Sequence, residues 1–73
     1  MQKFGEKLCV LRQNEGLTVR ELGNMLNVSG PYVVQMEHGR KIPNAPMIIK
    51  IARLFNVSTD QLMMDELELD DDE

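Results

Sequence analysis

Apolar residues recur every three or four positions in several stretches of the chain, which is the period of an amphipathic α-helix. The first such stretch holds Phe4, Leu8 and Leu11 and predicts a helix over about residues 2–14 that ends before Gly16. No stretch alternates apolar and polar residues in the way that a half-buried strand does. The chain is therefore expected to be all-α.

Two short helices separated by a three-residue turn are predicted next. Thr18 and Glu21 stand three residues apart, which is the spacing of a capping box at the start of a helix. The buried face of this helix is expected to carry Leu22 and Leu26, four residues apart. Asn27 follows them and suits the left-handed backbone of a helix end. These signals place a short helix directly before the turn.

The helix after the turn is expected to begin behind Ser29, whose hydroxyl can cap it. Gly30 and Pro31 fall in its first turn, where the missing N–H of proline costs little. Val33 and Met36 are three residues apart and are expected to face inward. The side chains left facing outward are those of Pro31, Tyr32 and Gln35.

Two further helices are predicted in the second half of the chain. Asn44 can cap the first of them, and Pro46 falls in its opening turn. The buried stripe expected on this helix consists of Ile48, Ile51, Ala52 and Phe55. Ser58 and Gln61 have the spacing of a second capping box, which opens a short helix through Met63. Five helices around a single core are expected.

Length and composition narrow the class of protein. Seventy-three residues are enough for one small domain, and a single cysteine excludes an internal disulfide. Charged residues near the start interrupt what would be the apolar part of a signal peptide, and no apolar run approaches the roughly 20 residues that a membrane span needs. We therefore expect a cytoplasmic protein with no membrane partner.

The charges are distributed unevenly along the chain. Its net charge is −4, but the segment 65–73, DELELDDDE, holds seven of the twelve acidic residues and no basic one. Residues 1–64 have eight Lys/Arg against five Asp/Glu, a net charge of +3. A run of like charges repels itself and usually stays solvated. We expect residues 1–65 to form the folded domain and residues 66–73 to be an acidic, disordered tail.

Catalytic and metal-binding chemistry is not expected. Cys9 has apolar neighbours that indicate an inert or partly buried thiol, and the single histidine, His38, is predicted to lie on another helix. No Cys/His spacing suits zinc. We predict a protein that is not an enzyme and that needs no metal or cofactor.

Three blocks of sequence, in order and at characteristic separations, carry a resemblance to a known family. They are LRQNEGLTVRELGNMLNVS, VVQMEHGRKIP and IIKIARLFNVSTDQL. Over roughly residues 4–64 the chain resembles the phage-repressor/Cro-type helix-turn-helix family, also called the XRE family. The resemblance implies a five-helix lambda-repressor-like domain. It also implies a sequence-specific DNA-binding transcriptional regulator that covers an inverted repeat as a homodimer.

The resemblance places the helix after the turn in the major groove of double-stranded DNA. The candidates for contact with base edges are Gly30, Pro31, Tyr32, Val34 and Gln35. The candidates for contact with phosphates are Thr18, Arg20, Ser29, Arg40, Lys41 and Asn44. Gln35 is the strongest single candidate, because a glutamine amide can pair with adenine N6 and N7 together. Tyr32 either contacts DNA or packs on the neighbouring helix, and Val34 contacts either a thymine methyl group or a protein.

The sequence departs from the family pattern at two positions and keeps it at two others. Val19 stands where the family very often has a glutamine that contacts phosphate and braces the recognition helix. Gly23 replaces a small alanine at a close helix crossing. Arg12 and Glu37 match positions that form an internal ion pair in the family, which implies a structural role for both. Gly30 and Pro31 offer no side-chain donor, so direct readout of bases is expected to be sparse.

A dimer surface is expected at the C-terminal end, where apolar residues exceed what a small core needs. Its members are Leu62, Met63, Met64 and Leu67. A domain of this size leaves no room for a small-molecule effector pocket. The alternative interpretation is a protein-interaction module that keeps the same fold and binds a protein through the exposed Val19, Tyr32 and Val34.

Overall fold

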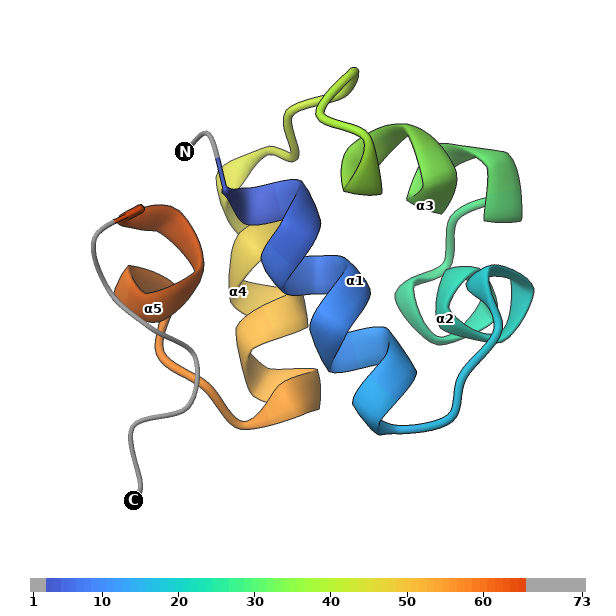
Figure 1. Ribbon diagram of the computed structural model, residues 1–73, viewed down its shortest axis with the longest axis horizontal. Helices are drawn as coiled ribbons and strands as arrows, with labels where there is room; N and C mark the ends of the chain where they lie inside the picture. The colour runs from blue at the N-terminus through green and yellow to red at the C-terminus, as the bar shows by residue number, and fades with distance from the viewer. Residues whose placement is uncertain (1–2, 66–73) are drawn as a thin grey trace.

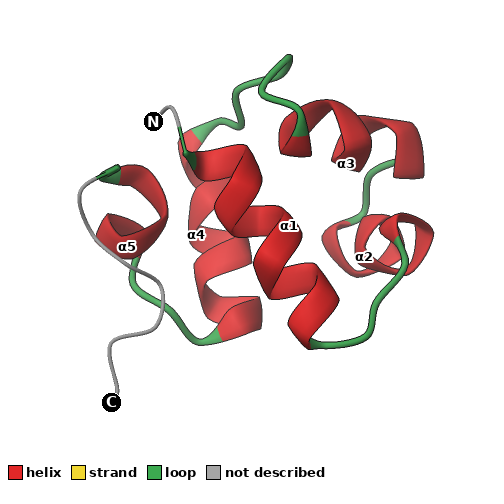
Figure 2. Ribbon diagram, viewed as in Figure 1, coloured by secondary structure: helices red, strands yellow, loops and turns green. Residues whose placement is uncertain are grey.

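The computed structural model describes residues 3–65, which form five α-helices joined by short connections (Figure 1). Within these residues there is no strand (Figure 2), which confirms the all-α prediction. The helices are α1 (Phe4–Asn14), α2 (Val19–Leu26), α3 (Gly30–Glu37), α4 (Ala45–Phe55) and α5 (Thr59–Met63). The first helix begins at Phe4, two residues later than the apolar pattern predicted.

Both capping boxes predicted from the sequence are present. At the start of α2, Thr18 Oγ1 accepts a hydrogen bond from the Glu21 N–H at 3.0 Å, and Glu21 Oε1 accepts one from the Thr18 N–H at 2.8 Å. At the start of α5, the Ser58 and Gln61 pair makes the same two bonds, each 2.9 Å long. Two orphan N–H groups at each helix start are thereby satisfied.

The remaining helix ends also follow the sequence signals. Ser29 caps α3 by accepting from the Tyr32 N–H at 3.2 Å, and Asn44 caps α4 by accepting from the Met47 N–H at 2.9 Å. The helix-ending Asn27 has a left-handed backbone, with φ of 66°. Asparagine tolerates this conformation better than most residues do, which explains why α2 can end sharply and turn toward α3.

Among residues 3–65, ten apolar side chains are buried in the core, and all five helices contribute to them. They are Phe4, Leu8, Leu22, Leu26, Val33, Met36, Ile48, Ile51, Ala52 and Leu62. Leu11 and Phe55 were expected among them but are only half-buried and pack against the margin of this core. Each lies in the last turn of its helix, at the edge of the bundle.

Close helix crossings depend on two glycines. A Cβ atom at Gly5 would collide with the Glu37 carbonyl oxygen and would lie 2.6 Å from that of Met36, so α1 can approach the end of α3 only without a side chain there. A Cβ atom at Gly23 would lie 2.7 Å from the Val28 carbonyl oxygen. The absence of a side chain at Gly23 thus lets the turn fold back onto α2.

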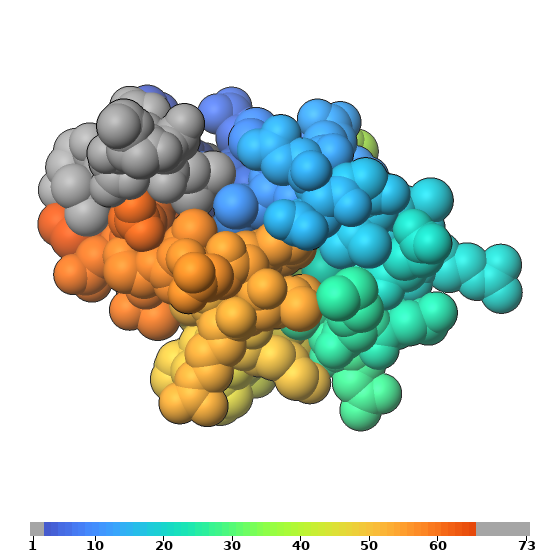
Figure 3. All heavy atoms as spheres, turned by 90° about the horizontal axis from the view of Figure 1, so that it is seen from below, coloured from blue at the N-terminus to red at the C-terminus, as the bar shows by residue number. Residues whose placement is uncertain are grey.

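Lysine side chains join helices that are distant in the sequence. The largely buried Lys7 of α1 donates from Nζ to the carbonyl oxygens of Gln61, at 2.5 Å, and Met64, at 2.8 Å. On another side, Lys50 Nζ of α4 donates to the Leu26 carbonyl oxygen at 3.1 Å, at the end of α2. Lysine ammonium groups thus donate hydrogen bonds to backbone carbonyl oxygens near the C-terminal ends of α5 and α2. Seen from below, α4 and α2 form one continuous surface (Figure 3).

The expected dimer surface needs a correction at Leu62. This side chain is 0% exposed and belongs to the core, together with buried side chains of the other four helices. Met63 and Met64 are 39% and 42% exposed and remain on the surface. Leu67 and the predicted tail, residues 66–73, lie outside the described residues. None of the described helices has the length and apolar character required to cross a bilayer.

Candidate nucleic-acid interface

The helix pair α2 and α3 presents one edge of α3 to the outside. Val33 and Met36 on the inner side of α3 are both fully buried, which fixes the rotation of the helix about its axis. Pro31 and Gln35 are consequently exposed, as predicted, while Val34 is half-buried. A Cβ atom at Gly30 would lie 3.5 Å from Arg20 Cα, so the first turn of α3 rests against α2. Packing against the core and against α2 therefore determines where the free edge of α3 lies.

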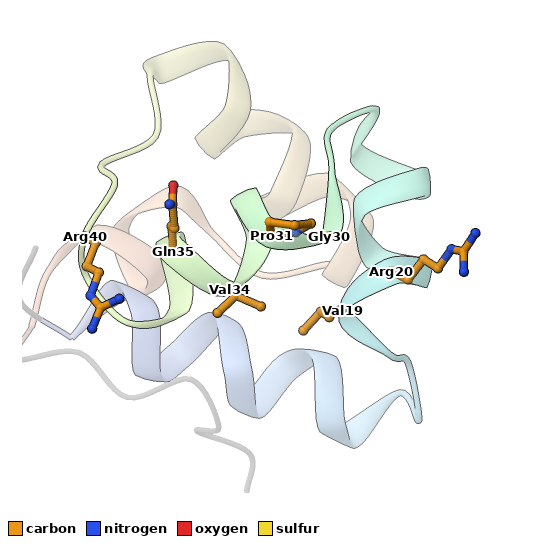
Figure 4. Close-up of a pocket in the computed structure, with 7 residues that line it drawn as sticks. All are labelled: Val19, Arg20, Gly30, Pro31, Val34, Gln35 and Arg40. Carbon is orange, nitrogen blue, oxygen red and sulfur yellow. The ribbon is translucent and has the colours of Figure 1, made fainter.

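An open groove of about 580 Å³ runs along this edge. Its lining residues come from α2, from α3 and from the loop that follows α3, and they are Val19, Arg20, Gly30, Pro31, Val34, Gln35 and Arg40. Figure 4 shows Val19 and Val34 in the middle, with Arg20 on one side and Arg40 on the other. The groove therefore has an apolar centre with an arginine at each end, and the Arg20 guanidinium group points outward, away from the other labelled side chains.

The structure brings some of the predicted contact residues together and separates others. Arg20 and Arg40, two phosphate candidates, share the groove with four base-edge candidates. Lys41 instead lines a hollow between the loop and α1, together with Phe4 and other residues. Asn44 lines a third hollow at the start of α4. Both side chains are exposed, but neither lines the groove along the edge of α3.

Two phosphate candidates, Thr18 and Ser29, are engaged as helix caps. Each hydroxyl oxygen accepts a backbone N–H bond, and each residue is exposed. A hydroxyl group that accepts one hydrogen bond can still donate its own hydrogen. Capping and phosphate contact are therefore compatible at both positions, and both mark the positive end of an eight-residue helix.

The spacing of apolar residues predicted that Tyr32 faces outward, but the structure places it otherwise. It is half-buried and packs against the margin of the core. This corresponds to the second of the two alternatives considered for it, in which the ring packs on a neighbouring helix. Its position on α3 remains beside the groove, but the ring is not among the groove-lining groups.

The implied ion pair between Arg12 and Glu37 is present. Arg12 Nε lies 2.7 Å from Glu37 Oε2, and Arg12 Nη2 lies 3.3 Å from Oε1, so both oxygens of the carboxylate are engaged. Arg12 Nη1 also donates to the Leu17 carbonyl oxygen at 2.8 Å. The hydrogen bond with Glu37 raises the pKa of Arg12. This cluster anchors the end of α3 to α1 and to the connection before α2.

One groove residue was absent from the predicted contact set. Val19 forms part of the apolar centre. The sequence had singled it out as a departure from the family pattern and as part of the alternative protein-binding surface, but not as a DNA contact. Val19 is the first residue of α2, directly after the cap Thr18, and it lines the groove together with Gly30 and Pro31 at the start of α3. Lys7 was also missed, and nothing in its immediate sequence indicates that it caps α5.

Residues 3–65 contain no group of three or more His, Cys, Asp or Glu side chains arranged to hold a metal ion. Cys9 is half-buried, and its sulfur lies 3.7 Å from Arg12 Nη2. His38 is exposed at the end of α3, where its backbone N–H bonds to the Val34 carbonyl oxygen at 3.0 Å. The groove contains neither of them.

Comparisons with solved structures identify the same arrangement of helices elsewhere. The P22 c2 repressor protein, solved in complex with synthetic operator 9T, superposes with a TM-score of 0.81 at 24% identity over 90% of this chain and 100% of that one. A transcriptional regulator from Listeria innocua superposes with a TM-score of 0.80 at 29% identity, over 94% of this chain and 64% of that one. The fold is lambda-repressor-like.

Sequence comparisons give relatives as well. The chain is 34% identical over 64 residues to the transcriptional activator BcrR of Enterococcus faecalis, covering 88% of this chain and 31% of that protein. It is 32% identical over 60 residues to the transcriptional regulator ImmR of Bacillus subtilis (strain 168), covering 82% and 47%. The chain thus spans less than half the length of these relatives. Because the helix-turn-helix profile matches residues 11–62, most of the body described above, the chain belongs to the helix-turn-helix family of the phage-repressor (XRE) type.

Proposed function

We propose that this protein is a sequence-specific DNA-binding transcriptional regulator. The observation that carries the proposal is the free edge of α3, where the exposed Gln35 lies in a groove that ends in Arg20 and Arg40. The relatives named as transcriptional activator and transcriptional regulator support it. They include an activator, so family membership alone does not imply repression.

The proposed mode of binding inserts the edge of α3 into the major groove. The Gln35 amide then pairs with adenine N6 and N7, which discriminates against a wrong base by about 1–3 kcal/mol. Arg20 and Arg40 neutralise phosphates on the two sides of the helix and release counterions. Their separate positions at the two ends of the groove suit the two backbones that border a major groove.

We further propose that two copies bind an inverted repeat whose half-sites are about 34 Å apart. The exposed apolar side chains at the far end of the molecule, Ile49 and Met63, border a hollow between α4 and α5 that Ala45, Ile48 and Thr59 complete. Met64 is exposed next to it. This surface replaces the one predicted around Leu62 and would place both α3 helices on one face of the duplex.

The proposal is tested by selecting binding sites from a randomised duplex library and then titrating the selected duplex across salt concentrations. Each phosphate contact is expected to add about −0.9 to the slope of log K against log salt. Gln35→Ala should relax the preference at one or two base pairs, while Arg40→Ala should weaken all sequences alike and lower the slope by about one contact. Failure to enrich any sequence would contradict the proposal.

A second candidate function is favoured by the apolar centre of the groove. Val19 and Val34 would suit a protein partner if the fold served as an interaction module. In that case Gln35→Ala and Arg40→Ala would leave DNA binding unchanged, while both variants keep the helicity of the parent protein. Circular dichroism and the same duplex titration together separate the two functions.

A further inference from the structure

A hollow of about 330 Å³ lies between the start of α1 and the loop that joins α3 to α4 (Figure 1). None of the described residues that line it also lines the groove along α3. Its lining is mostly apolar and includes Phe4, Met36, Ile42 and Pro43. Ile42 is 78% exposed, more than any other large apolar side chain in residues 3–65. The hollow therefore has an apolar wall that faces solvent.

The hollow also has a positive rim. Among the described residues that line it, Lys41 is the charged one, and its side chain is exposed. Arg40, which precedes Lys41 on the same loop, is exposed as well and lines the α3 groove. An occupant that matches this hollow must carry apolar side chains together with negative charge.

The end of the described body is held close to the hollow. The Lys3 N–H donates to Asp65 Oδ1 at 2.8 Å, and Lys3 directly precedes Phe4 of the lining. An extended chain advances about 3.3 Å per residue, so Leu67 and Leu69 lie within about 7 Å and about 13 Å of Asp65 along the chain. The residues that follow Asp65 are therefore long enough to enter the hollow.

The sequence of this end has the chemistry that the hollow requires. Residues 66–73, which lie outside the described residues, read ELELDDDE and contain six acids and two leucines. In an extended segment, side chains two positions apart point to the same side. Leu67 and Leu69 would thus share one apolar face, with carboxylates on the other side and beyond.

We propose that the segment 66–73 docks in this hollow, with its leucines against Phe4 and Ile42 and its carboxylates toward Lys41. A tethered segment acts at an effective concentration on the order of millimolar, so it occupies the hollow ahead of a second copy or a separate partner. The hollow is therefore a docking surface for the chain's own C-terminal segment.

Docking of this segment has a consequence that rests on the proposed function. The docked carboxylates lie beside Lys41 and Arg40, which are both candidates for phosphate contact. Phosphate and the segment then compete for the same charges, so each weakens the binding of the other by the same factor. The segment would act as a built-in competitor of DNA.

A tryptophan placed at the hollow reports whether it is covered, because the chain contains no tryptophan of its own. In full-length Ile42→Trp, the emission is expected at shorter wavelength, and with less quenching by acrylamide, than in the same protein that also carries Leu67→Ser and Leu69→Ser. The serine substitutions keep all six acids. The difference should not depend on protein concentration, because docking occurs within one chain.

Met25→Trp is the matched control, since Met25 is exposed on α2 and does not line the hollow. Its emission should not respond to the two serine substitutions. A second measurement avoids any contact that the tryptophan itself creates: in the chain without tryptophan, the serine substitutions should shift the backbone amide signals of Gly39, Lys41 and Ile42 in nuclear magnetic resonance spectra. Circular dichroism confirms that each variant keeps its helices.

The outcomes separate docking from the proposed function. Emission and amide signals that ignore the serine substitutions overturn the docking proposal, and so does an emission shift that grows with protein concentration, which would assign the hollow to a second copy. With docking present, the serine variant should bind the selected duplex severalfold more tightly at low salt. An unaltered duplex affinity would overturn the competition and leave the docking intact. Failure to enrich any duplex contradicts the proposed function alone, because the emission measurement contains no DNA.

Discussion

The position of the proposed DNA-contacting helix α3 depends on Arg12, a residue outside the groove. Its guanidinium group contacts Glu37 at the end of α3 and the Leu17 carbonyl oxygen ahead of α2. The side chains of Arg12 and Glu37 are only 15% and 8% exposed. An uncompensated charge left in such a place is far more damaging than the pair is stabilising.

Glu37→Gln is expected to lower the free energy of unfolding by about 3 kcal/mol, because it keeps the shape of the side chain and removes the charge that compensates Arg12. Urea denaturation followed by circular dichroism measures the change. Glu15→Gln, at an exposed position just after α1, is the matched control and should change stability by less than about 0.5 kcal/mol. Equal effects of the two substitutions would contradict the structural role of the pair.

At the scale of the elements, α3 is positioned by two close crossings that require glycine. Because Gly23 has no side chain, the turn before α3 can pack against α2, and because Gly5 has none, the carbonyl oxygens at the end of α3 can pack against α1. The two contacts lie at opposite ends of the same helix. Each therefore controls the direction in which the free edge of α3 points.

For Gly5→Ala, helix propensity and tertiary packing predict changes in stability of opposite sign. Helix propensity alone would stabilise α1 by about 1 kcal/mol, since alanine is the better helix former. The new Cβ atom would instead press on the Met36 and Glu37 carbonyl oxygens, so we expect a net loss of about 2 kcal/mol. Thermal or urea unfolding decides the sign. Gln13→Ala, exposed on the same helix, should not destabilise the protein.

The helix ends could be predicted from the sequence because their causes are local. Thr18 with Glu21, and Ser58 with Gln61, need only a three-residue spacing to form a capping box. Lys7 could not be placed in this way, because its acceptors lie more than fifty positions away in the chain.

The candidate site was predictable to the extent that α3 faces outward and carries Gln35. Two features of it depend on how α2 and α3 pack: the inclusion of Val19 in the groove and the partial burial of Tyr32. The burial of Leu62 likewise follows from the packing of α5, since adjacent apolar residues at a chain end do not indicate which of them turns inward.

At the scale of the whole molecule, the proposed DNA-contacting and self-associating surfaces lie at different ends. The edge of α3 is on one side of the bundle, and α5 is on the other, with α1 and α4 between them (Figure 1). A substitution on α5 can therefore alter association without touching the groove. This separation makes the two proposals independently testable.

Met63→Glu is expected to prevent dimer formation without unfolding the protein, because Met63 is exposed at the hollow between α4 and α5. Its neighbour Leu62 is the matched contrast: Leu62→Ala removes a fully buried side chain and should lower stability by about 3 kcal/mol. Sedimentation equilibrium and urea denaturation measure the two effects. A Met63→Glu protein that associates as the parent does would remove Met63 from the proposed interface.

Residues 66–73 contribute six acidic residues, so their deletion changes the net charge from −4 to +2. We expect the shortened protein to bind DNA several-fold more tightly at low salt, because like-charge repulsion with phosphate is removed. The gain should vanish near 1 M salt, where the screening length is about 3 Å. Replacing the six acids by their amides should have the same effect if charge is the cause. A gain that persists at high salt would point to another cause.

The hydrogen bond from the Lys3 N–H to Asp65 Oδ1, 2.8 Å long, brings the two limits of the described body together beside α5. The start of α1 lies close to the end of α3, because a Cβ atom at Gly5 would press on the Met36 and Glu37 carbonyl oxygens, whereas α5 lies on the other side of the bundle from α3 (Figure 1). The proximity of the two limits makes the fold suitable for circular permutation, with a short peptide bridging Lys3 and Asp65 and new termini opened in an exposed connection.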